Sequence, residues 1–337
     1  MSKKGILLVN LGTPDSPSVP DVKKYLDQFL MDERVIDIPK LNRTLLVKGA
    51  IVPFRSPKTA KLYTEIWDEQ TGSPLLYYSV LQARMLQDKL GDGYQVELAM
   101  RYQNPSIESG LAKLKAALVE SIQVIPLFPQ YASASTGSVM QLVMELVSKW
   151  PTVPPISFVN SFHDNELMIR VFADNARKHQ VESFDHVLFS FHGLPERQLL
   201  KCDHTGSYCL KTADCCQTLN DTNKFCYSAQ GHDTARLIAK ELGLAKENYT
   251  VCFQSRLGKE PWVQPYTTDV LKRLAAEGKK RLLVFSPAFV ADCLETLYEI
   301  TVEYHEEFRT LGGEHVQLVE SLNDNPLFID ALAGMVK

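Results

Sequence analysis

Long apolar runs and an excess of positive charge are both missing from this 337-residue sequence. No stretch stays apolar over the roughly 20 residues that a membrane-spanning helix needs. The N-terminal apolar run ends before Gly12 and Pro14, which is too short for a signal peptide. The net charge of −4 supplies no positive field for phosphates and argues against a general nucleic-acid-binding protein. We therefore expect a cytoplasmic protein without a nucleic-acid partner.

Cysteine is scarce everywhere except in one segment. The chain has seven cysteines. Five of them share that segment: Cys202, Cys209, Cys215, Cys216 and Cys226. In a cytoplasmic chain such crowding indicates metal or redox chemistry before structural disulfides. Four thiolates suit a [2Fe–2S] cluster or a zinc site with four cysteine ligands, and free thiols are the third alternative. The other two, Cys252 and Cys293, are interpreted as small buried hydrophobes.

Strand-like and helix-like segments alternate along the whole chain. The expected strands are 5–10, 94–100, 122–128, 187–191, 249–254, 281–286 and 316–319, with a helical pattern after most of them. This alternation predicts an α/β protein with parallel sheets and right-handed crossovers, arranged as two units. The proline-rich stretch 149–155 is the best linker candidate between them.

His192 lies where a buried strand must end. The run 187–191 is almost entirely apolar, and a Gly-Leu-Pro turn follows the histidine. Open α/β sheets bind ligands at the carboxyl ends of their strands, so this position favours a functional histidine. The alternative is a structural histidine bonded to nearby backbone. An imidazole here can act as a metal ligand or as a base.

Five carboxylates recur after the strand at 281–286, in a helix expected from about 292 to 309. They are Asp292, Glu295, Glu299, Glu303 and Glu306. At α-helical spacing they share one face roughly 80° wide. A solvated amphipathic helix explains the pattern, but no lysine interrupts the like charges. Together with His192 the stripe suggests handling of a divalent cation such as Fe(II), Zn(II) or Co(II).

Seven segments, in order along essentially the whole chain, resemble those of ferrochelatases. They are Val-Asn-Leu-Gly-Thr-Pro at 9–14, Met-Arg-Tyr at 100–102, Gln-Tyr-Ala-Ser-Ala-Ser-Thr-Gly-Ser at 130–138, Ser-Phe-His-Gly-Leu-Pro-Glu-Arg at 190–197, Gln-Ser-Arg-Leu-Gly-Lys-Glu-Pro-Trp at 254–262, Ala-Phe-Val-Ala-Asp-Cys-Leu-Glu-Thr-Leu-Tyr-Glu at 288–299 and Glu-Ser-Leu-Asn-Asp-Asn-Pro-Leu-Phe at 320–328. The resemblance implies a lyase that inserts Fe(II) into protoporphyrin IX, giving protohaem in the last step of haem synthesis.

The same resemblance implies where the site residues lie. His192 and Glu295 would bind the metal, and His192 would also accept pyrrole protons. Asp292 and Glu299 would extend an acidic path. The residues expected to line the porphyrin cleft are Arg101, Tyr102, Ser133, Ser135, Thr136 and Trp262. The implied chelatase fold has two Rossmann-like lobes, 1–150 and 156–320, with the C-terminal helix at 321–337 rejoining the first.

The roles of two segments are not decided by their residues alone. The stretch 40–61 has six basic residues, no acidic ones and interleaved apolar side chains. It is expected to contact an anionic membrane surface peripherally, and a packed helix with solvated lysines is the alternative.

The cysteine-rich insert 198–232 resembles a loop that holds a [2Fe–2S] cluster in some bacterial ferrochelatases. Gly231 stands where such relatives often have a cysteine, so the four ligands are not assigned.

Three other functions compete with this prediction. A cobalt or nickel chelatase for a more reduced tetrapyrrole is disfavoured by the segment 254–262. Coproporphyrin is a closer alternative substrate, because ring substituents leave little trace in a sequence. A haem- or iron-responsive binding module could keep the fold without turnover, but the pair His192 and Glu295 argues for catalysis.

Overall fold

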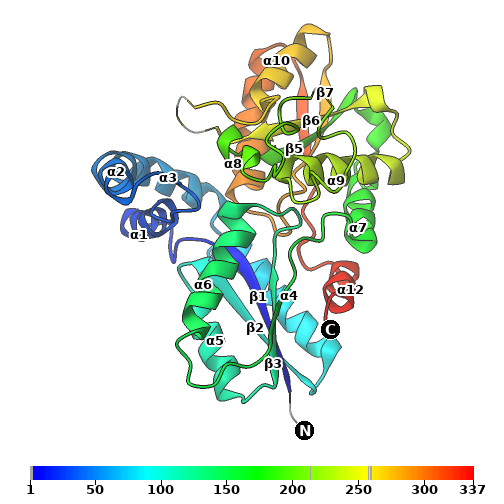
Figure 1. Cartoon of the computed structure of the whole chain (residues 1–337). Helices are drawn as coiled ribbons and strands as arrows, with labels where there is room; N and C mark the ends of the chain where they lie inside the picture. The colour runs from blue at the N-terminus through cyan, green and yellow to red at the C-terminus, as the bar shows by residue number, and fades with distance from the viewer. Residues whose placement is uncertain (1–2, 213, 257, 259) are drawn as a thin grey trace. The chain divides into compact units, whose positions relative to one another are not determined.

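The computed structural model describes residues 3–212, 214–256, 258 and 260–337, and the chain forms two compact units. The first unit holds the chain up to Phe128, then Ala132–Asn160 and Ile329–Lys337. The second holds Pro129–Tyr131 and Ser161–Phe328. Each unit contains a four-stranded parallel sheet flanked by helices, which confirms the predicted fold class (Figure 1).

The first sheet has the strand order β2-β1-β3-β4. Its strands are β1 (Lys4–Gly12), β2 (Tyr94–Tyr102), β3 (Ser121–Pro126) and β4 (Ile156–Phe158). The first unit therefore continues past the proline-rich stretch 149–155, since Ile156 pairs with Ile122 of β3. Strand β4 was not predicted because it has only three residues and follows two prolines.

Helices cover both faces of this sheet. Successive β1 side chains point to opposite faces. Leu7 and Val9 face a core shared with α5 (Ile107–Ala116) and α6 (Ser138–Val147). On the other face, Asn10 Nδ2 donates to Ser79 Oγ of α4 (Pro74–Leu90) at 3.0 Å, so α4 covers that side.

The second sheet repeats the arrangement with the order β6-β5-β7-β8. Its strands are β5 (His186–His192), β6 (Tyr249–Gln254), β7 (Arg281–Phe285) and β8 (His315–Leu318). One face, with Leu188 and Val284, packs on α10 (Thr267–Ala276) and on the helical segment 295–310. The other face packs on α7 (Glu166–Arg177) and α9 (Tyr227–Glu241), where Phe172 meets Phe285 at 6.5 Å between ring centroids.

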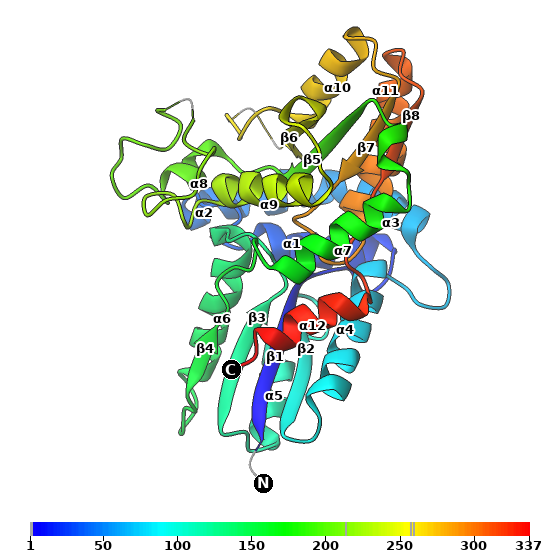
Figure 2. The same ribbon diagram turned by 90° about the vertical axis from the view of Figure 1, so that its right-hand side faces the viewer.

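Further helical segments connect or extend these elements (Figure 2). They are α1 (Val19–Leu30), α2 (Lys40–Leu46), η1 (Val47–Ile51), α3 (Val52–Ile66), η2 (Ser133–Gly137), η3 (Val181–Ser183), α8 (Glu196–Leu200), η4 (Lys246–Asn248), η5 (Glu295–Tyr304), α11 (His305–Thr310) and α12 (Pro326–Gly334). After α12 the backbone O of Met335 accepts from Gln123 Nε2 of β3 at 2.7 Å. Within the described residues, no helix has the length and apolarity needed to cross a bilayer.

Candidate active site

His192 is the last residue of β5, beside Gln254 at the end of β6. Residue 193, which follows His192, must be glycine because a Cβ there would lie 2.7 Å from the backbone O of Gln254 and 3.2 Å from the Trp262 ring. This close approach lets the Gly193 N–H donate to Gln254 O at 2.8 Å. The predicted cleft residue Trp262 therefore lies directly against the turn that follows His192.

The surroundings of His192 favour its neutral form. Its side chain is half-buried, and its ring meets Phe289 edge-on at 6.3 Å between centroids. Burial lowers the pKa of His192 from its usual value, while the Glu295 carboxylate opposes that shift. The structure therefore brings the predicted metal-binding pair within electrostatic reach of each other in the second unit, and it favours the neutral imidazole, the form that can accept a proton.

Glu295 begins a π-helix, η5 (Glu295–Tyr304), which continues as α11 (His305–Thr310). The helix predicted from about 292 to 309 is therefore present, but it begins at Glu295 and its first ten residues form a π-helix instead of an α-helix. Glutamates four residues apart lie on one face of a π-helix about as well as on one face of an α-helix, so the sequence could not distinguish the two helix types. Cys293 is buried as predicted, but its thiol also donates to Glu295, and burial with this contact raises the pKa of Cys293.

Asp292 lies before the π-helix, and its carboxylate is surrounded by donors. Oδ2 accepts from Asn323 Nδ2 at 2.7 Å, and Oδ1 accepts from Thr296 Oγ1 at 3.0 Å. The backbone N–H of Ser321 also donates to Oδ1, at 3.2 Å. With only 5% of the residue exposed, this carboxylate joins the start of the helix to the segment after β8.

Glu299 is held by three donors from the same unit. Its carboxylate accepts from Ser255 Oγ at 2.7 Å, Tyr304 OH at 2.8 Å and Gln254 Nε2 at 3.2 Å. Ser255 has a φ of 66°, a left-handed conformation that is uncommon for serine and directs the chain away from the end of β6. Burial raises the pKa of Glu299 to about 7, although the Ser255 and Tyr304 donors oppose the shift.

The raised pKa of Glu299 predicts a pH-dependent contribution to stability. The ordinary pKa of a glutamate is 4.5, and the pKa of Glu299 in the folded state is about 7. Between these two pH values, the folded state binds more protons than the unfolded state. The free energy of unfolding of the wild type, minus that of Glu299→Gln, should therefore fall as pH rises through this window. Urea unfolding at several pH values measures it, with the exposed Glu306→Gln as control. A difference that rises with pH would contradict the prediction.

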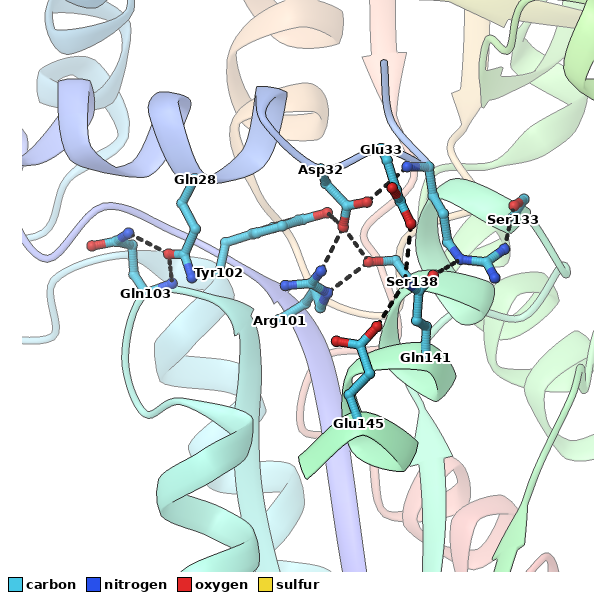
Figure 3. A network of polar contacts seen from close by, with 11 residues as sticks. Gln28, Asp32, Glu33, Arg101, Tyr102, Gln103, Ser133, Ser138, Gln141 and Glu145 are labelled. Carbon is cyan, nitrogen blue, oxygen red and sulfur yellow. Dashed lines mark hydrogen bonds and ion pairs between the residues drawn. The ribbon is translucent and has the colours of Figure 1, made fainter. Parts of the chain in front are cut away.

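A polar network in the first unit surrounds two of the predicted porphyrin residues (Figure 3). Asp32 Oδ2 accepts from Arg101 Nη2 at 2.6 Å, Tyr102 OH at 2.9 Å and Ser138 Oγ at 2.5 Å. Arg101 Nε also donates to Ser138 Oγ at 2.6 Å. Tyr102 is fully buried, and burial raises its pKa. One carboxylate oxygen thus organises this group.

The predicted serine and threonine contacts lie at the start of α6, in the π-turn η2 (Ser133–Gly137). Ser133 Oγ accepts from Arg34 Nη1 at 2.8 Å, and Arg34 Nε donates to Gln141 Oε1 at 2.5 Å. Ser133 and Ser135 are half-buried, whereas Thr136 is fully buried. The structure therefore groups Arg101, Tyr102 and this segment in the first unit.

Five cysteines line one pocket in the insert of the second unit. Cys226 is the N-cap residue of α9, and the thiols of Cys209 and Cys216 donate to its sulfur. These bonds, with the backbone N–H groups of Ser228 and Ala229, lower the pKa of Cys226 to about 3. Cys215 and Cys216 place their sulfurs 3.7 Å apart. Cys202 Sγ instead contacts the backbone O of Gln198 at 3.8 Å.

A mononuclear metal site is not preformed in the part of the chain that the structure describes. No three or more His, Cys, Asp or Glu side chains there are arranged to hold one ion. The insert thiols instead form close contacts with each other, Cys226 with Cys209 and Cys216, and Cys215 with Cys216.

Comparison with known proteins identifies the family. The family model described as ferrochelatase matches residues 3–337. A protein named ferrochelatase from Legionella pneumophila (strain Lens) is 44% identical over 336 residues, covering 99% of this chain and 98% of that protein. Another so named, from Coxiella burnetii (strain Dugway 5J108-111), is 43% identical over 336 residues, covering 100% and 94%. The chain belongs to the ferrochelatase family.

This membership confirms the resemblance seen in the seven sequence segments. Ferrochelatase is a lyase that inserts iron into a porphyrin, so the predicted enzyme class is confirmed, and neither coproporphyrin insertion nor a non-catalytic binding module is favoured. The ferrochelatase chain also shares its fold with the solved structure "SirB from Bacillus subtilis with Fe3+". The TM-score is 0.53 at 14% identity, covering 98% of this chain and 93% of that chain. This likeness concerns the fold alone.

Sequence reasoning overlooked several side chains that contact the predicted site residues within each unit. Asp32 is distant in sequence from Arg101, so no local pattern links them. Gln254 and Ser255 lie in a recognised segment, yet no role was assigned to either. Their position at the end of β6, beside the end of β5, was the signal that could have found them.

Proposed function

We propose that this chain inserts Fe(II) into protoporphyrin IX, with His192 and Glu295 as the residues that carry the reaction. The observation that supports this most is a half-buried, neutral imidazole at a strand end, in electrostatic contact with a carboxylate, in a chain matched along its length by ferrochelatases. The reaction replaces two pyrrole N–H protons with one Fe(II). The site must therefore supply a base and oxygen or nitrogen donors for the metal.

The proposed roles follow from the chemistry of each side chain. His192, kept neutral by burial, accepts the two pyrrole protons one after the other and passes each to water, and the Glu295 carboxylate stabilises the imidazolium that forms each time. Glu295 also offers an oxygen ligand to the incoming iron. Glu299, fixed by Ser255 and Tyr304, lies one turn further along η5 and leads toward the exposed Glu303. Trp262, packed against Gly193, is proposed to contact the macrocycle.

An anaerobic assay with Fe(II) and protoporphyrin IX tests the proposed reaction. We expect the free porphyrin spectrum to convert to that of protohaem only when active protein is present. Omitting iron, or adding heat-denatured protein, controls for spontaneous insertion. Porphyrin binding without metal insertion would support the non-catalytic binding module instead.

For the insert, we propose that Cys209, Cys215, Cys216 and Cys226 bind a [2Fe–2S] cluster. Each iron in a [2Fe–2S] cluster binds two protein thiolates, so the cluster needs four cysteine sulfurs that lie close to one another. The 3.7 Å separation of Cys215 and Cys216 and the thiol contacts of Cys226 support this ligand set. A bound cluster would supply redox-active iron, while the chain holds the thiolates and stabilises them with the N–H groups that begin α9.

The cluster proposal predicts a visible difference between cysteine variants. Protein prepared without oxygen should absorb in the visible range and release iron and acid-labile sulfide in about equal amounts. Cys226→Ser should lose both signals, whereas Cys202→Ser should keep them. Cys252→Ser, which changes a buried cysteine of β6, is the matched control. Colourless wild-type protein without sulfide would contradict the proposal.

We also propose a peripheral membrane contact through α2, η1 and α3, in a cytoplasmic protein. Leu41, Leu45 and Phe54 are 70%, 66% and 75% exposed, which is unusual for large apolar side chains. Lys40, Arg55, Lys58 and Lys61 are exposed among them. Arg43 is an exception, because it is buried and donates to the backbone O of Ile36 and Ile38.

Binding to vesicles tests this surface. Leu41→Ser combined with Phe54→Ser should weaken sedimentation with anionic phosphatidylserine vesicles by about tenfold, because two inserted apolar side chains are lost. Leu118→Ser is the matched control, since Leu118 is 83% exposed elsewhere in the same unit. Equal binding by all three proteins would contradict the membrane contact.

A further inference from the structure

The cysteine-rich insert has turns where most of the chain has helices and strands. In the described residues 201–212 and 214–226, between α8 and α9, the backbone follows turns and bends. Helices and strands pair their own backbone N–H and C=O groups, whereas a segment of turns needs side chains for part of this pairing. Two side chains that supply it are those of Asp203 and Asn223, which line the same pocket as the five cysteines.

Asp203 fixes the stretch that carries Cys209. Its Oδ2 accepts from the backbone N–H groups of Tyr208 and Cys209, each at 2.9 Å. Its Oδ1 accepts from the Thr205 N–H at 2.9 Å and from Thr205 Oγ1 at 2.7 Å. One carboxylate thus closes the turns that lead to Cys209, a residue that is only 7% exposed.

Asn223 joins the stretches that carry Cys215 and Cys226. Its Nδ2 donates to the backbone O of Cys215 and of Thr218, both at 2.8 Å, and its Oδ1 accepts from the Asn220 N–H at 2.7 Å. Its own backbone O accepts from the Cys226 N–H at 2.8 Å. Because Asn223 is only 5% exposed, its loss would leave buried polar groups without a partner.

Cys202 is bonded differently. Its N–H donates to the backbone O of Leu199 at 2.9 Å, and its Sγ contacts the backbone O of Gln198 at 3.8 Å. Both partners belong to α8, so Cys202 follows the end of that helix. The bonds of Asp203 and Asn223 therefore reach proposed cluster ligands, whereas the fifth cysteine depends on the helix.

We propose that Asp203 and Asn223 are positioning residues that fix Cys209, Cys215 and Cys226 in place before the cluster binds. This inference rests on the [2Fe–2S] cluster proposed above. A site that must order its own loops when it binds loses affinity to the entropy of that ordering. Hydrogen bonds between protein groups alone remove this cost, because the ligand-bearing turns are then already fixed.

Alkylation of the individual thiols tests the inference. The full-length protein, with its iron removed by a chelator, is treated with iodoacetamide, and mass spectrometry gives the rate at each cysteine. Each rate is divided by the wild-type rate of the same cysteine, because thiols differ in intrinsic reactivity. Asp203→Ala should raise this ratio about tenfold at Cys209, because the bonds to three backbone N–H groups are lost.

Asn223→Ala should instead raise the ratio about tenfold at Cys215 and Cys226. Asn223→Asp is a milder variant, since its carboxylate can still accept from Asn220 but cannot donate to Cys215. It should raise the ratio at Cys215, and it decides the test if an alanine variant does not fold. Asp221→Ala, at a fully exposed side chain of the same insert, is the matched control and should leave every ratio within about twofold of one.

Cys202 and Cys252 show whether the loosening is local. Cys202 follows α8 and Cys252 is fully buried in β6, so both ratios should stay within about twofold of one in every variant. Unchanged ratios at Cys209 and Cys215 would overturn the inference. An equal rise at all the cysteines would also overturn it, because the two side chains would then stabilise the whole unit.

Cluster uptake gives a second measurement. Cluster-free wild-type protein, mixed anaerobically with Fe(II) and sulfide, should develop visible absorbance. The two alanine variants should develop it about tenfold more slowly but reach the same final spectrum, because every cysteine ligand is still present. Cys226→Ser should not reach that spectrum. Equal uptake rates in the wild type and both alanine variants would contradict the positioning role.

Failure of the cluster proposal gives a different result. Wild-type protein that takes up neither iron nor sulfide would remove the cluster. The alkylation ratios do not involve the cluster, so they would still decide whether Asp203 and Asn223 position the thiols.

Discussion

His192→Ala should lower kcat for Fe(II) insertion by about a thousandfold, which is within the range that a well-placed general base contributes. His192 is the last residue of β5, and burial keeps its imidazole neutral beside Glu295. Alanine removes both the proton acceptor and a nitrogen ligand for the metal. The measurement is the anaerobic insertion assay, with porphyrin affinity followed separately by fluorescence quenching.

The matched control lies on the same strand. His186 begins β5, is 6% exposed and contacts Thr250 Oγ1 through Nε2 at 2.9 Å. His186→Gln should keep its activity per folded molecule, even if the protein becomes less stable. His192→Ala protein that binds porphyrin and retains more than about a tenth of the wild-type kcat would remove the catalytic role.

Asp292→Ala should lower the free energy of unfolding by about 3 kcal/mol, because the buried carboxylate accepts three hydrogen bonds. Alanine removes the acceptor of hydrogen bonds from Asn323 Nδ2, Thr296 Oγ1 and the Ser321 N–H, although Thr296 Oγ1 also donates to the backbone O of Cys293 at 3.2 Å. Urea unfolding measures the effect. This prediction differs from the role in an acidic metal path that the sequence suggested for Asp292.

Two comparisons separate these roles of Asp292. The exposed Glu303→Ala on η5 should change stability by less than about 0.5 kcal/mol. Asn323→Ala removes a donor to Asp292 from outside the helix and should reproduce part of the loss. If Asp292→Ala were as stable as the wild type but inactive, the metal-path role would stand and the structural one would fail.

The sequence predicted the place of His192 in the fold better than the contacts around it. The apolar run before His192 and the glycine after it marked a strand end, and His192 is indeed the last residue of β5. The pattern of glutamates brought Glu295 to the same edge. These features depend on local periodicity and on the general geometry of parallel sheets, both of which can be read from neighbouring residues.

The remaining contacts depend on chain segments that are distant in sequence. Nothing near Arg101 predicts its pairing with Asp32, and nothing near Asp292 predicts its bond to Asn323. Strand β4 is defined by pairing with β3, since its three residues carry almost no propensity signal. The stretch 40–61 was left open between a peripheral membrane contact and a packed helix with solvated lysines. It is helical, with Arg43 buried and Phe54 exposed.

The π-helix η5 limits which insertions and deletions this enzyme can accept during evolution. A π-turn differs from an α-turn by about one additional residue, so deleting one residue within 295–304 would favour an ordinary α-helix. The residues on either side of the deletion would then rotate relative to one another by about 100°. Glu295 and Tyr304 could not both keep their present partners. We therefore expect lineages to keep the length of this helix fixed, and to exchange side chains mainly at positions other than Glu295 and Glu299.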